Sequence, residues 1–314
     1  MTPVRVGVWG LGAHAAKRVL PAIAACPSLA LVALHTRDAK RLRGLGEELQ
    51  CATFESTDEF LANQELDLVY IATPSGLHVA HTRRALSAGK HVVCEKPLAA
   101  RGADAEELVG LARARGLALL EAFMYLHHPH HEALRQRVRG QVRIVRASFS
   151  LPPLAAPGFR EDASLGGGAL LDVGCYPLSL ALDLVDGEPT VAFSRLGYAR
   201  SIDREGHATL EFPGGEVAFL DWAYDRTYVN EATITCTSGV VRSNRVFSKG
   251  PSEVATLEVC DERGAWSTEP VPAADAFVQM LSTVADRISD LSFREAEFTA
   301  IARRARLLQA LITR

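Results

Sequence analysis

The sequence predicts an α/β Rossmann dinucleotide-binding domain in residues 1–122, followed by an α+β domain with a large, mainly antiparallel open sheet in residues 123–314. Three observations support this prediction. In the first part, short apolar runs alternate with helical patterns, as in a parallel sheet covered by helices. A glycine-rich turn follows the first apolar run. In the second part, β-type runs separated by turn residues replace this alternation.

The first domain is expected to contain five parallel strands and four helices. The apolar runs predict strands at 4–9, 29–35, 68–73, 91–95 and 118–123. Helical spacing of apolar residues predicts helices at 13–25, 38–49, 78–88 and 103–115. Strands that alternate with helices over short connections are expected to be parallel. The carboxyl ends of parallel strands meet at one edge of the sheet, where open α/β sheets bind ligands.

The second domain is expected to hold one sheet and a few long helices. Helices are predicted near 130–139 and at 167–186, 273–289 and 295–312. The β-type runs cover 142–150, 191–199, 207–212, 216–224, 231–237 and 240–247. Glycine-containing turns between consecutive runs favour hairpins. We expect a helix on one face of this sheet and another subunit on the other, and the last helix may pack back on the first domain.

Composition restricts the class of protein. The chain has 314 residues, 48% of them hydrophobic, and a net charge of −3. Acidic and basic residues are evenly distributed, so a nucleic-acid partner is not expected. The longest apolar run, at 29–34, is too short to span a membrane, and the N-terminus lacks the pattern of a signal peptide. Six scattered cysteines exclude a disulfide framework. We therefore expect a soluble, cytoplasmic protein.

The first motif is a G-x-G-x-x-A turn placed between a strand and a helix. Gly10 permits the tight turn, Gly12 lets the backbone approach a pyrophosphate, and Ala15 allows close packing. The alternative is a tight turn whose small residues serve packing alone. The residues expected to border the dinucleotide here are Gly10, Leu11, Gly12, Ala13, His14 and Ala15.

The end of the second strand indicates which dinucleotide is bound. Thr36 and Arg37 stand where an NAD enzyme would usually place an acidic residue. A hydroxyl followed by a guanidinium suits the 2′-phosphate of NADP(H), because arginine forms charge-assisted hydrogen bonds to phosphate. NAD(H) is less favoured. In the alternative interpretation Arg37 is solvated and Asp38 reaches the ribose.

The second motif lies at the ends of the third and fourth strands. Thr73 and Pro74 follow the third strand, and Glu95 and Lys96 follow the fourth. These residues, with the nearby His78, are expected to border the cofactor because they share its edge of the sheet. A surface lysine at the end of a strand is the alternative for Lys96.

Four motifs together resemble the Gfo/Idh/MocA family of oxidoreductases. They are G-x-G-x-x-A, A-T-P-x-x-x-H, A-G-K-H-V-x-x-E-K-P and G-G-G-A-L-L-D-x-G, and the resemblance is clear over residues 4–187. It implies that Lys96 is the active-site lysine, facing substrate and nicotinamide. It also implies that Glu95 holds the loop and that the peptide bond before Pro97 is often cis.

The third motif lies on the helix expected at 167–186. Asp172 and Tyr176 are four residues apart and should share one helical face. Gly168 and Gly174 suggest close approach by another group. The resemblance implies that Tyr176 is the general acid, that Lys96 stabilises its anion, and that Asp172 binds a sugar hydroxyl or orients Lys96. A core tyrosine with a satisfied hydroxyl is the alternative for Tyr176.

Four histidines in residues 127–131 look at first like a metal site. No carboxylate or thiolate cluster accompanies them, so no metal is expected. The stretch F-M-Y-L-H-H-P instead resembles nucleotide-sugar 3-ketoreductases of deoxysugar pathways. His128 is therefore expected to line the substrate pocket. Arg160 either meets a diphosphate or sugar hydroxyl or is a loop arginine.

Together these features predict an NADP(H)-dependent oxidoreductase that reduces a keto group of a sugar. The most specific version is a reductase of a 3-keto nucleotide-linked deoxysugar, with Lys96, Tyr176 and Asp172 as its catalytic residues and Lys96, His128, Arg160, Asp172 and Tyr176 as its substrate contacts. The alternatives are a dihydrodiol or free-sugar dehydrogenase and a non-enzymatic cofactor or sugar sensor. A homodimer or homotetramer formed through the second-domain sheet is expected.

Overall fold

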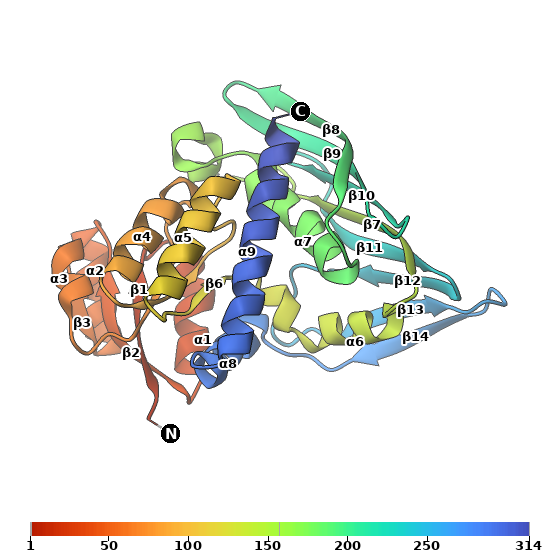
Figure 1. The fold of residues 1–314 in the computed structure, drawn as a ribbon. Coiled ribbons are helices and arrows are strands. Elements are labelled where there is room, and N and C mark those ends of the chain that lie inside the picture. Colours follow the sequence, from red (N-terminus) through yellow and green to blue (C-terminus); the bar gives the residue numbers. More distant parts are fainter. Residues whose placement is uncertain (1, 157, 314) are drawn as a thin grey trace. The chain divides into compact units, whose positions relative to one another are not determined.

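The computed structural model describes residues 2–156 and 158–313 (Figure 1). The chain forms two compact units. Unit 1 contains Met1–Ala122 and Phe277–Ala305, and unit 2 contains Phe123–Ala276 and Arg306–Arg314. The sequence-based division placed all of residues 123–314 in the second domain, with the last helix free to pack back. In the structure, most of the two C-terminal helices belongs to unit 1 by its contacts.

Unit 1 is built on a six-stranded parallel sheet in the order β3-β2-β1-β4-β5-β6. Its strands are β1 (Val4–Trp9), β2 (Leu29–His35), β3 (Ala52–Phe54), β4 (Leu68–Ile71), β5 (His91–Cys94) and β6 (Leu119–Glu121). This order is the one found in Rossmann folds, so the predicted class of the first domain is confirmed. The sequence analysis missed β3, a three-residue edge strand that is largely exposed.

The helices of unit 1 flank this sheet. They are η1 (Ala15–Val19), α1 (Leu20–Ala24), α2 (Ala39–Leu49), α3 (Thr57–Ala62), the short 3₁₀ turn η2 (Ser75–Leu77), α4 (His78–Ser87), α5 (Gly102–Ala114), α8 (Ala276–Arg287) and most of α9 (Leu291–Ile312). The helix predicted at 13–25 is continuous over residues 13–24 and contains a π turn. The sequence analysis missed α3, which is capped by the side chain of Ser56.

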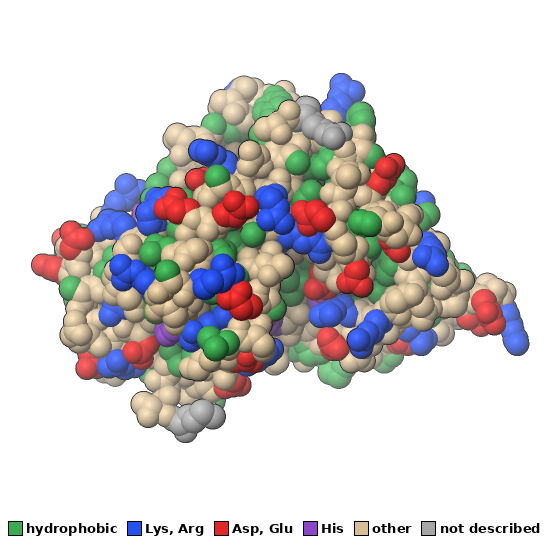
Figure 2. Space-filling view, in the orientation of Figure 1, with side chains coloured by type: hydrophobic (Ala, Val, Ile, Leu, Met, Phe, Trp, Pro, Cys, Tyr) green, Lys and Arg blue, Asp and Glu red, His purple; other side chains and the backbone are tan. Residues whose placement is uncertain are grey.

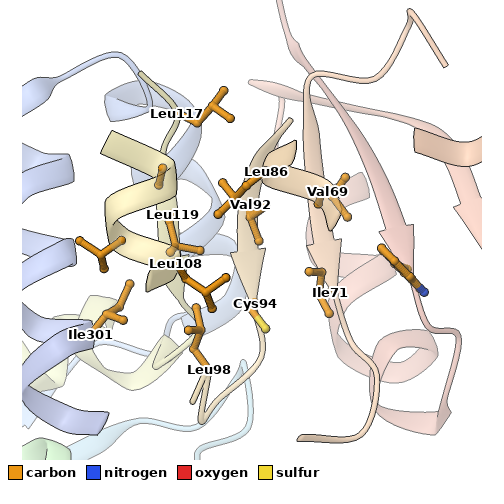
Figure 3. Packing of buried hydrophobic residues seen from close by; sticks show 14 of the residues in the cluster. Val69, Ile71, Leu86, Val92, Cys94, Leu98, Leu108, Leu117, Leu119 and Ile301 are labelled. Carbon is orange, nitrogen blue, oxygen red and sulfur yellow. The ribbon is translucent and has the colours of Figure 1, made fainter. Parts of the chain in front are cut away.

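A single hydrophobic cluster explains why the helix α9 belongs to unit 1. Ile301 of α9 lies in the same cluster as Leu108 of α5 and Val92 of β5 (Figure 3). Phe298 and Ala305 of α9 belong to it as well. Complete burial of a side chain such as Ile301 contributes about 1.5–3 kcal/mol, so α9 stabilises the sheet that carries the predicted cofactor site.

Unit 2 is built on an eight-stranded sheet in the order β14-β13-β12-β11-β7-β10-β9-β8. Neighbouring strands are antiparallel except β7 and β10, which are parallel, so the mainly antiparallel sheet predicted from the sequence is confirmed. The strands are β7 (Val142–Ser150), β8 (Thr190–Ala199), β9 (Ile202–Glu211), β10 (Val217–Ala223), β11 (Val229–Cys236), β12 (Gly239–Asn244), β13 (Ala255–Cys260) and β14 (Trp266–Val271). The last two were not predicted.

The helices of unit 2 are short apart from one long apolar segment. They are η3 (Met124–His127), α6 (Pro129–Val138), η4 (Gly158–Glu161), η5 (Ala163–Leu165), η6 (Leu170–Gly174) and α7 (Cys175–Leu184). Ala163–Leu184 is long and apolar enough to span a bilayer, but 72% of its most apolar window is buried inside the protein. This burial is typical of a core helix in a globular domain.

The glycines of the third motif make the close approaches that the sequence predicts. At Gly168, whose φ is +123°, a Cβ atom would overlap the carboxylate of Asp203. At Gly174 a Cβ atom would lie 2.7 Å from the indole ring of Trp222. Gly168 therefore precedes the helix, whereas Gly174 lets the helix rest directly on the sheet.

Candidate active site

Gly10 begins the phosphate cradle at the carboxyl end of β1. Its φ of +99° is disfavoured for any residue with a Cβ atom, and a Cβ atom here would lie 2.8 Å from the carbonyl oxygen of Ala72. Its backbone N–H donates to the carbonyl of His35, at 2.9 Å. The turn therefore packs against the ends of β2 and β4, and only glycine fits it.

The backbone beyond this turn is open. Gly12 has no atom within 4 Å of the position that a Cβ atom would occupy, and Ala13 and His14 are exposed. Leu11 and Ala15 bury their side chains on the other side. The start of the following helix thus offers unobstructed N–H groups and the positive end of the helix dipole, which suits a pyrophosphate.

The loop after β2 presents the guanidinium of Arg37 to solvent. The ring of His35 is buried, donating to the carbonyl of Phe54 and accepting from Thr57, so it turns away from the edge. Asp38 accepts from the N–H of Arg41 and caps α2, which leaves this carboxylate engaged. Arg37 is exposed and has no carboxylate partner within the described residues. The Arg37 guanidinium is therefore accessible to solvent, whereas the Asp38 carboxylate is engaged by the start of α2.

Glu95 connects the cradle to the end of β5. Its carboxylate accepts a hydrogen bond from His14 at 2.8 Å and one from the hydroxyl of Tyr70 at 2.7 Å. Burial alone would raise the pKa of Glu95, but His14, Tyr70 and the nearby charge of Lys96 outweigh burial and hold this pKa at about 2. Glu95 is therefore ionised, and its hydrogen bonds to His14 and Tyr70 anchor the chain directly before Lys96.

A cis peptide bond and the ring of His78 define the backbone beyond Lys96. The Lys96–Pro97 peptide bond is cis, as the resemblance implied. The ring of His78 lies 2.8 Å from the carbonyl oxygen of Pro97 and 2.8 Å from that of Thr73. His78 is 1% exposed, and both nitrogens face backbone, so its ring has no nitrogen left to contact a cofactor. Its predicted role as a cofactor contact is therefore replaced by a role within the protein.

Tyr176 stands among aromatic rings in unit 2. It is 8% exposed and its hydroxyl lies 3.8 Å from the sulfur of Met124. Ring centroids between 5.4 and 5.8 Å away belong to Phe123, Tyr125, Phe149 and Phe247. This packing fixes the direction of the phenol ring.

Asp172 is engaged on two sides within unit 2. It accepts from Arg160, whose Nε lies 2.5 Å away, and from the hydroxyl of Tyr224 at 3.1 Å. Burial and the Asp172 charge raise the pKa of Tyr224, so this phenol stays protonated and remains a donor. Burial lowers the pKa of Arg160, but the ion pair with Asp172 outweighs it and raises this pKa. Asp172 thus fixes Arg160. The sequence analysis expected Asp172 to bind a sugar hydroxyl or to orient Lys96 and did not predict this contact.

Three of the histidines in residues 127–131, His128, His130 and His131, have hydrogen-bond partners within the protein. His128 is 2% exposed; its Nδ1 accepts from the N–H of His130, capping α6, and its Nε2 donates to the carbonyl of Ala274. No nitrogen remains for a substrate, so the expectation for His128 does not fit this geometry. His131 pairs with Asp183. Over residues 2–156 and 158–313, no group of three His, Cys, Asp or Glu side chains is arranged to hold a metal ion.

The sequence analysis missed a buried ion pair beside the Lys96 segment. Glu121, at the end of β6, accepts from the N–H of Leu98 at 2.8 Å and from Nε of Arg304 at 2.6 Å. Glu121 is 6% exposed and Arg304 is 7% exposed. The only local signal was a carboxylate at the end of an apolar run, and Arg304 lies 183 residues further along the chain.

Comparison with known proteins adds to this geometry. Residues 4–123 match the model of an oxidoreductase family with an NAD-binding Rossmann fold, and residues 130–242 match the C-terminal domain model of the same family, Gfo/Idh/MocA. A dTDP-3,4-didehydro-2,6-dideoxy-alpha-D-glucose 3-reductase from Streptomyces violaceoruber is 36% identical, with 98% of this chain and 94% of that protein covered.

Two other proteins represent a solved structure and a different substrate. A 3-ketoreductase from Actinomadura kijaniata, solved with NADP and TDP-benzene, superposes with a TM-score of 0.93 at 32% identity, covering 99% of this chain and 98% of that one. It was also solved with a tyrosine replaced by phenylalanine and with a lysine replaced by alanine. A D-xylose 1-dehydrogenase (NADP(+)) from Haloferax volcanii is 32% identical over 86% of this chain and 85% of that protein.

Proposed function

The chain belongs to the Gfo/Idh/MocA oxidoreductase family, and on this basis we propose that it reduces a keto group of a nucleotide-linked deoxysugar with NADPH. The observation that carries this proposal is the similarity to a dTDP-sugar 3-reductase over nearly the full length of both proteins. The second candidate is a free-sugar dehydrogenase, which the xylose enzyme favours. Family membership supports an enzyme rather than a non-catalytic sensor.

In the proposed reaction, NADPH when bound supplies a hydride to the carbonyl carbon. Tyr176 of unit 2 then gives its hydroxyl proton to the carbonyl oxygen, and Lys96 of unit 1 supplies positive charge that stabilises the oxygen anion. An ordinary tyrosine has a pKa of about 10, so a nearby cation is what makes its proton available near neutral pH. Asp172 holds Arg160 in place through their ion pair.

The residues of unit 1 fit NADPH. The open backbone at Gly12 suits the pyrophosphate, and the exposed Arg37 with Thr36 suits the 2′-phosphate. Thr73 and Pro74, half-buried after β4, complete the set that would border the cofactor. All of these groups stand at the carboxyl ends of parallel strands, where such sheets bind ligands.

We expect NADPH to bind at least tenfold more tightly than NADH, because Arg37 contacts the 2′-phosphate. Replacing Arg37 with alanine should raise the Kd for NADPH about 10- to 100-fold, the loss of one charge-assisted hydrogen bond, and should leave the Kd for NADH unchanged. Titration of nicotinamide fluorescence measures both constants. Arg43→Ala is the matched control, since Arg43 is an exposed arginine of α2 that pairs with Glu55, the residue after β3. Equal affinity for NADH and NADPH would contradict this role.

We further propose that the uncovered face of the unit 2 sheet joins two or more copies of the chain. Backbone pairing places Phe193, Thr209, Phe219 and Arg146 in one row across four strands. Phe193 is 48% exposed and Phe219 is 42% exposed, while residues on either side of Phe219 in β10 are buried. Exposed aromatic rings on an open sheet are typical of a subunit interface.

The oligomer is expected to dissociate when this face carries a charge. Phe219→Glu should shift the mass measured by light scattering from a dimer or tetramer to a monomer. Leu291→Glu is the control, because Leu291 is 71% exposed at the start of α9 and lies outside the sheet. A monomeric wild-type protein would contradict the interface.

The chemistry of the chain is consistent with a cytoplasmic location. None of its six cysteines, all in the described part of the chain, forms a disulfide. On the face drawn in Figure 2, basic and acidic side chains are interspersed. We propose that the protein works in the cytoplasm, where NADPH is supplied.

A further inference from the structure

One buried histidine stands between the two loops that carry the predicted cofactor and lysine positions. His78, the first residue of α4, is 1% exposed. Its Nε2 lies 2.8 Å from the carbonyl oxygen of Thr73, in the loop after β4. Its Nδ1 lies 2.8 Å from the carbonyl oxygen of Pro97, directly after Lys96. A single rigid ring therefore spans the distance between these two loops.

Both partners of the ring are carbonyl oxygens, which only accept hydrogen bonds. Each contact therefore requires an N–H, and a neutral imidazole has one whereas the doubly protonated ring has two. Burial lowers the pKa of His78 and opposes the second proton. The two carbonyl oxygens and the Glu95 carboxylate act in the opposite direction, the charge of Lys96 lowers this pKa further, and the net shift is downward. At 2.8 Å on both sides, the geometry is that of a double donor.

The two loops have different tasks in the proposed reaction. Thr73 borders the cofactor, and its side chain is fixed by a hydrogen bond to His81 at 3.0 Å. Lys96 acts on the carbonyl oxygen of the substrate, and its backbone is followed at once by the Pro97 carbonyl that His78 holds. An error of about 1 Å in such a position can lower a rate about 100-fold.

We propose that His78 is a positioning residue that ties the Lys96 loop to the Thr73 loop and so sets where Lys96 stands relative to the cofactor. This inference rests on the proposed function of Lys96. A buried histidine with a purely structural role would change stability alone when replaced. A positioning residue changes the kinetic constants separately, according to which of its two bonds is lost.

Two variants separate the two bonds. In His78→Gln the amide nitrogen can replace Nε2 and keep the bond to Thr73, but the bond to Pro97 is lost. In His78→Asn the amide nitrogen can replace Nδ1 and keep the bond to Pro97, but the bond to Thr73 is lost. We expect H78Q to lower kcat about 10- to 100-fold with the Kd for NADPH unchanged. We expect H78N to raise that Kd about fivefold with kcat at saturation nearly unchanged.

The matched control is His91→Gln. His91 begins β5, the strand that leads to Lys96, and accepts from the N–H of Ala118 at the opposite end of the strand. This variant should lower the Tm, and any change in its kcat should be accompanied by a change in its Kd for NADPH. If both His78 variants change kcat and Kd together, as the control does, or if only one variant has an effect, His78 does not tie the two loops.

A second readout does not depend on activity. The chain has only five lysines, so ¹³C-dimethylation gives few NMR signals, and Lys96→Arg identifies that of Lys96. We expect H78Q to shift this signal and H91Q to leave it unchanged. A shifted signal in a protein that reduces no sugar ketone would retain the positioning role and reject the proposed function. An unchanged signal in an active enzyme would reject the positioning role alone.

Discussion

Replacing Tyr176 with phenylalanine is expected to lower kcat for sugar reduction about 10²- to 10⁴-fold, the usual contribution of a general acid. The ring should keep its place, because four aromatic rings with centroids 5.4–5.8 Å away hold it. Only the transferable proton is removed. Binding of NADPH should not change, since the residues proposed to hold it belong to unit 1.

Tyr125 provides the matched control for this variant. Its ring lies 5.8 Å from that of Tyr176, and its hydroxyl donates to Ser179 at 3.1 Å. Tyr125→Phe removes a hydroxyl from the same aromatic group and should keep kcat within about threefold, since a neutral hydrogen bond contributes little to the reaction. Steady-state rates at saturating NADPH measure both effects. A Tyr176→Phe enzyme as active as Tyr125→Phe would show that the proton comes from elsewhere.

Replacing Glu121 with alanine is expected to lower the free energy of unfolding by about 3–5 kcal/mol. The change leaves Arg304 buried without its carboxylate, and an uncompensated buried charge is strongly destabilising. It also removes the acceptor for the N–H of Leu98, two residues after Lys96. Denaturant unfolding followed by circular dichroism measures the first effect, and the kcat of the remaining folded enzyme measures the second.

Two comparisons isolate the buried charge. Glu295→Ala breaks an ion pair with Arg113, which joins α9 to α5 and is about half exposed, so this variant should change stability little. The double variant E121L/R304M removes both buried charges and should recover most of the stability lost in E121A. A double variant as unstable as E121A would mean that packing, rather than the unpaired charge, causes the loss.

The parts of the fold that the sequence predicted are those with strong local patterns. The order of strands and helices in unit 1 follows from apolar runs and from the turn at Gly10, whose geometry depends on a few neighbouring residues. β3 has three residues and one large apolar side chain, which is too little for a periodic signal. β13 does alternate buried and exposed residues and is followed by a turn at Gly264, but its length of six residues gives only a short periodic signal.

The candidate site divides in the same way. Residues in motifs at strand ends, such as Arg37, Glu95 and Lys96, stand where the pattern placed them. The contacts of buried rings were not predictable, because the sequence does not show which atoms a ring nitrogen reaches. His78 and His128 were therefore assigned to cofactor and substrate, whereas both contact backbone. Glu121 meets a partner 183 residues away, for which no local signal exists.

The central claim is that the substrate is a ketone on a nucleotide-linked sugar and that NADPH is the reductant. The most direct test is the rate of NADPH consumption at 340 nm with a dTDP-linked 3-keto-deoxysugar, compared with the rate of NADP⁺ reduction by D-xylose and by a dihydrodiol. We expect kcat/KM for the dTDP-linked ketone to exceed both others at least tenfold. Equal or higher kcat/KM for the free sugar or the diol would contradict the claim and favour the dehydrogenase alternative.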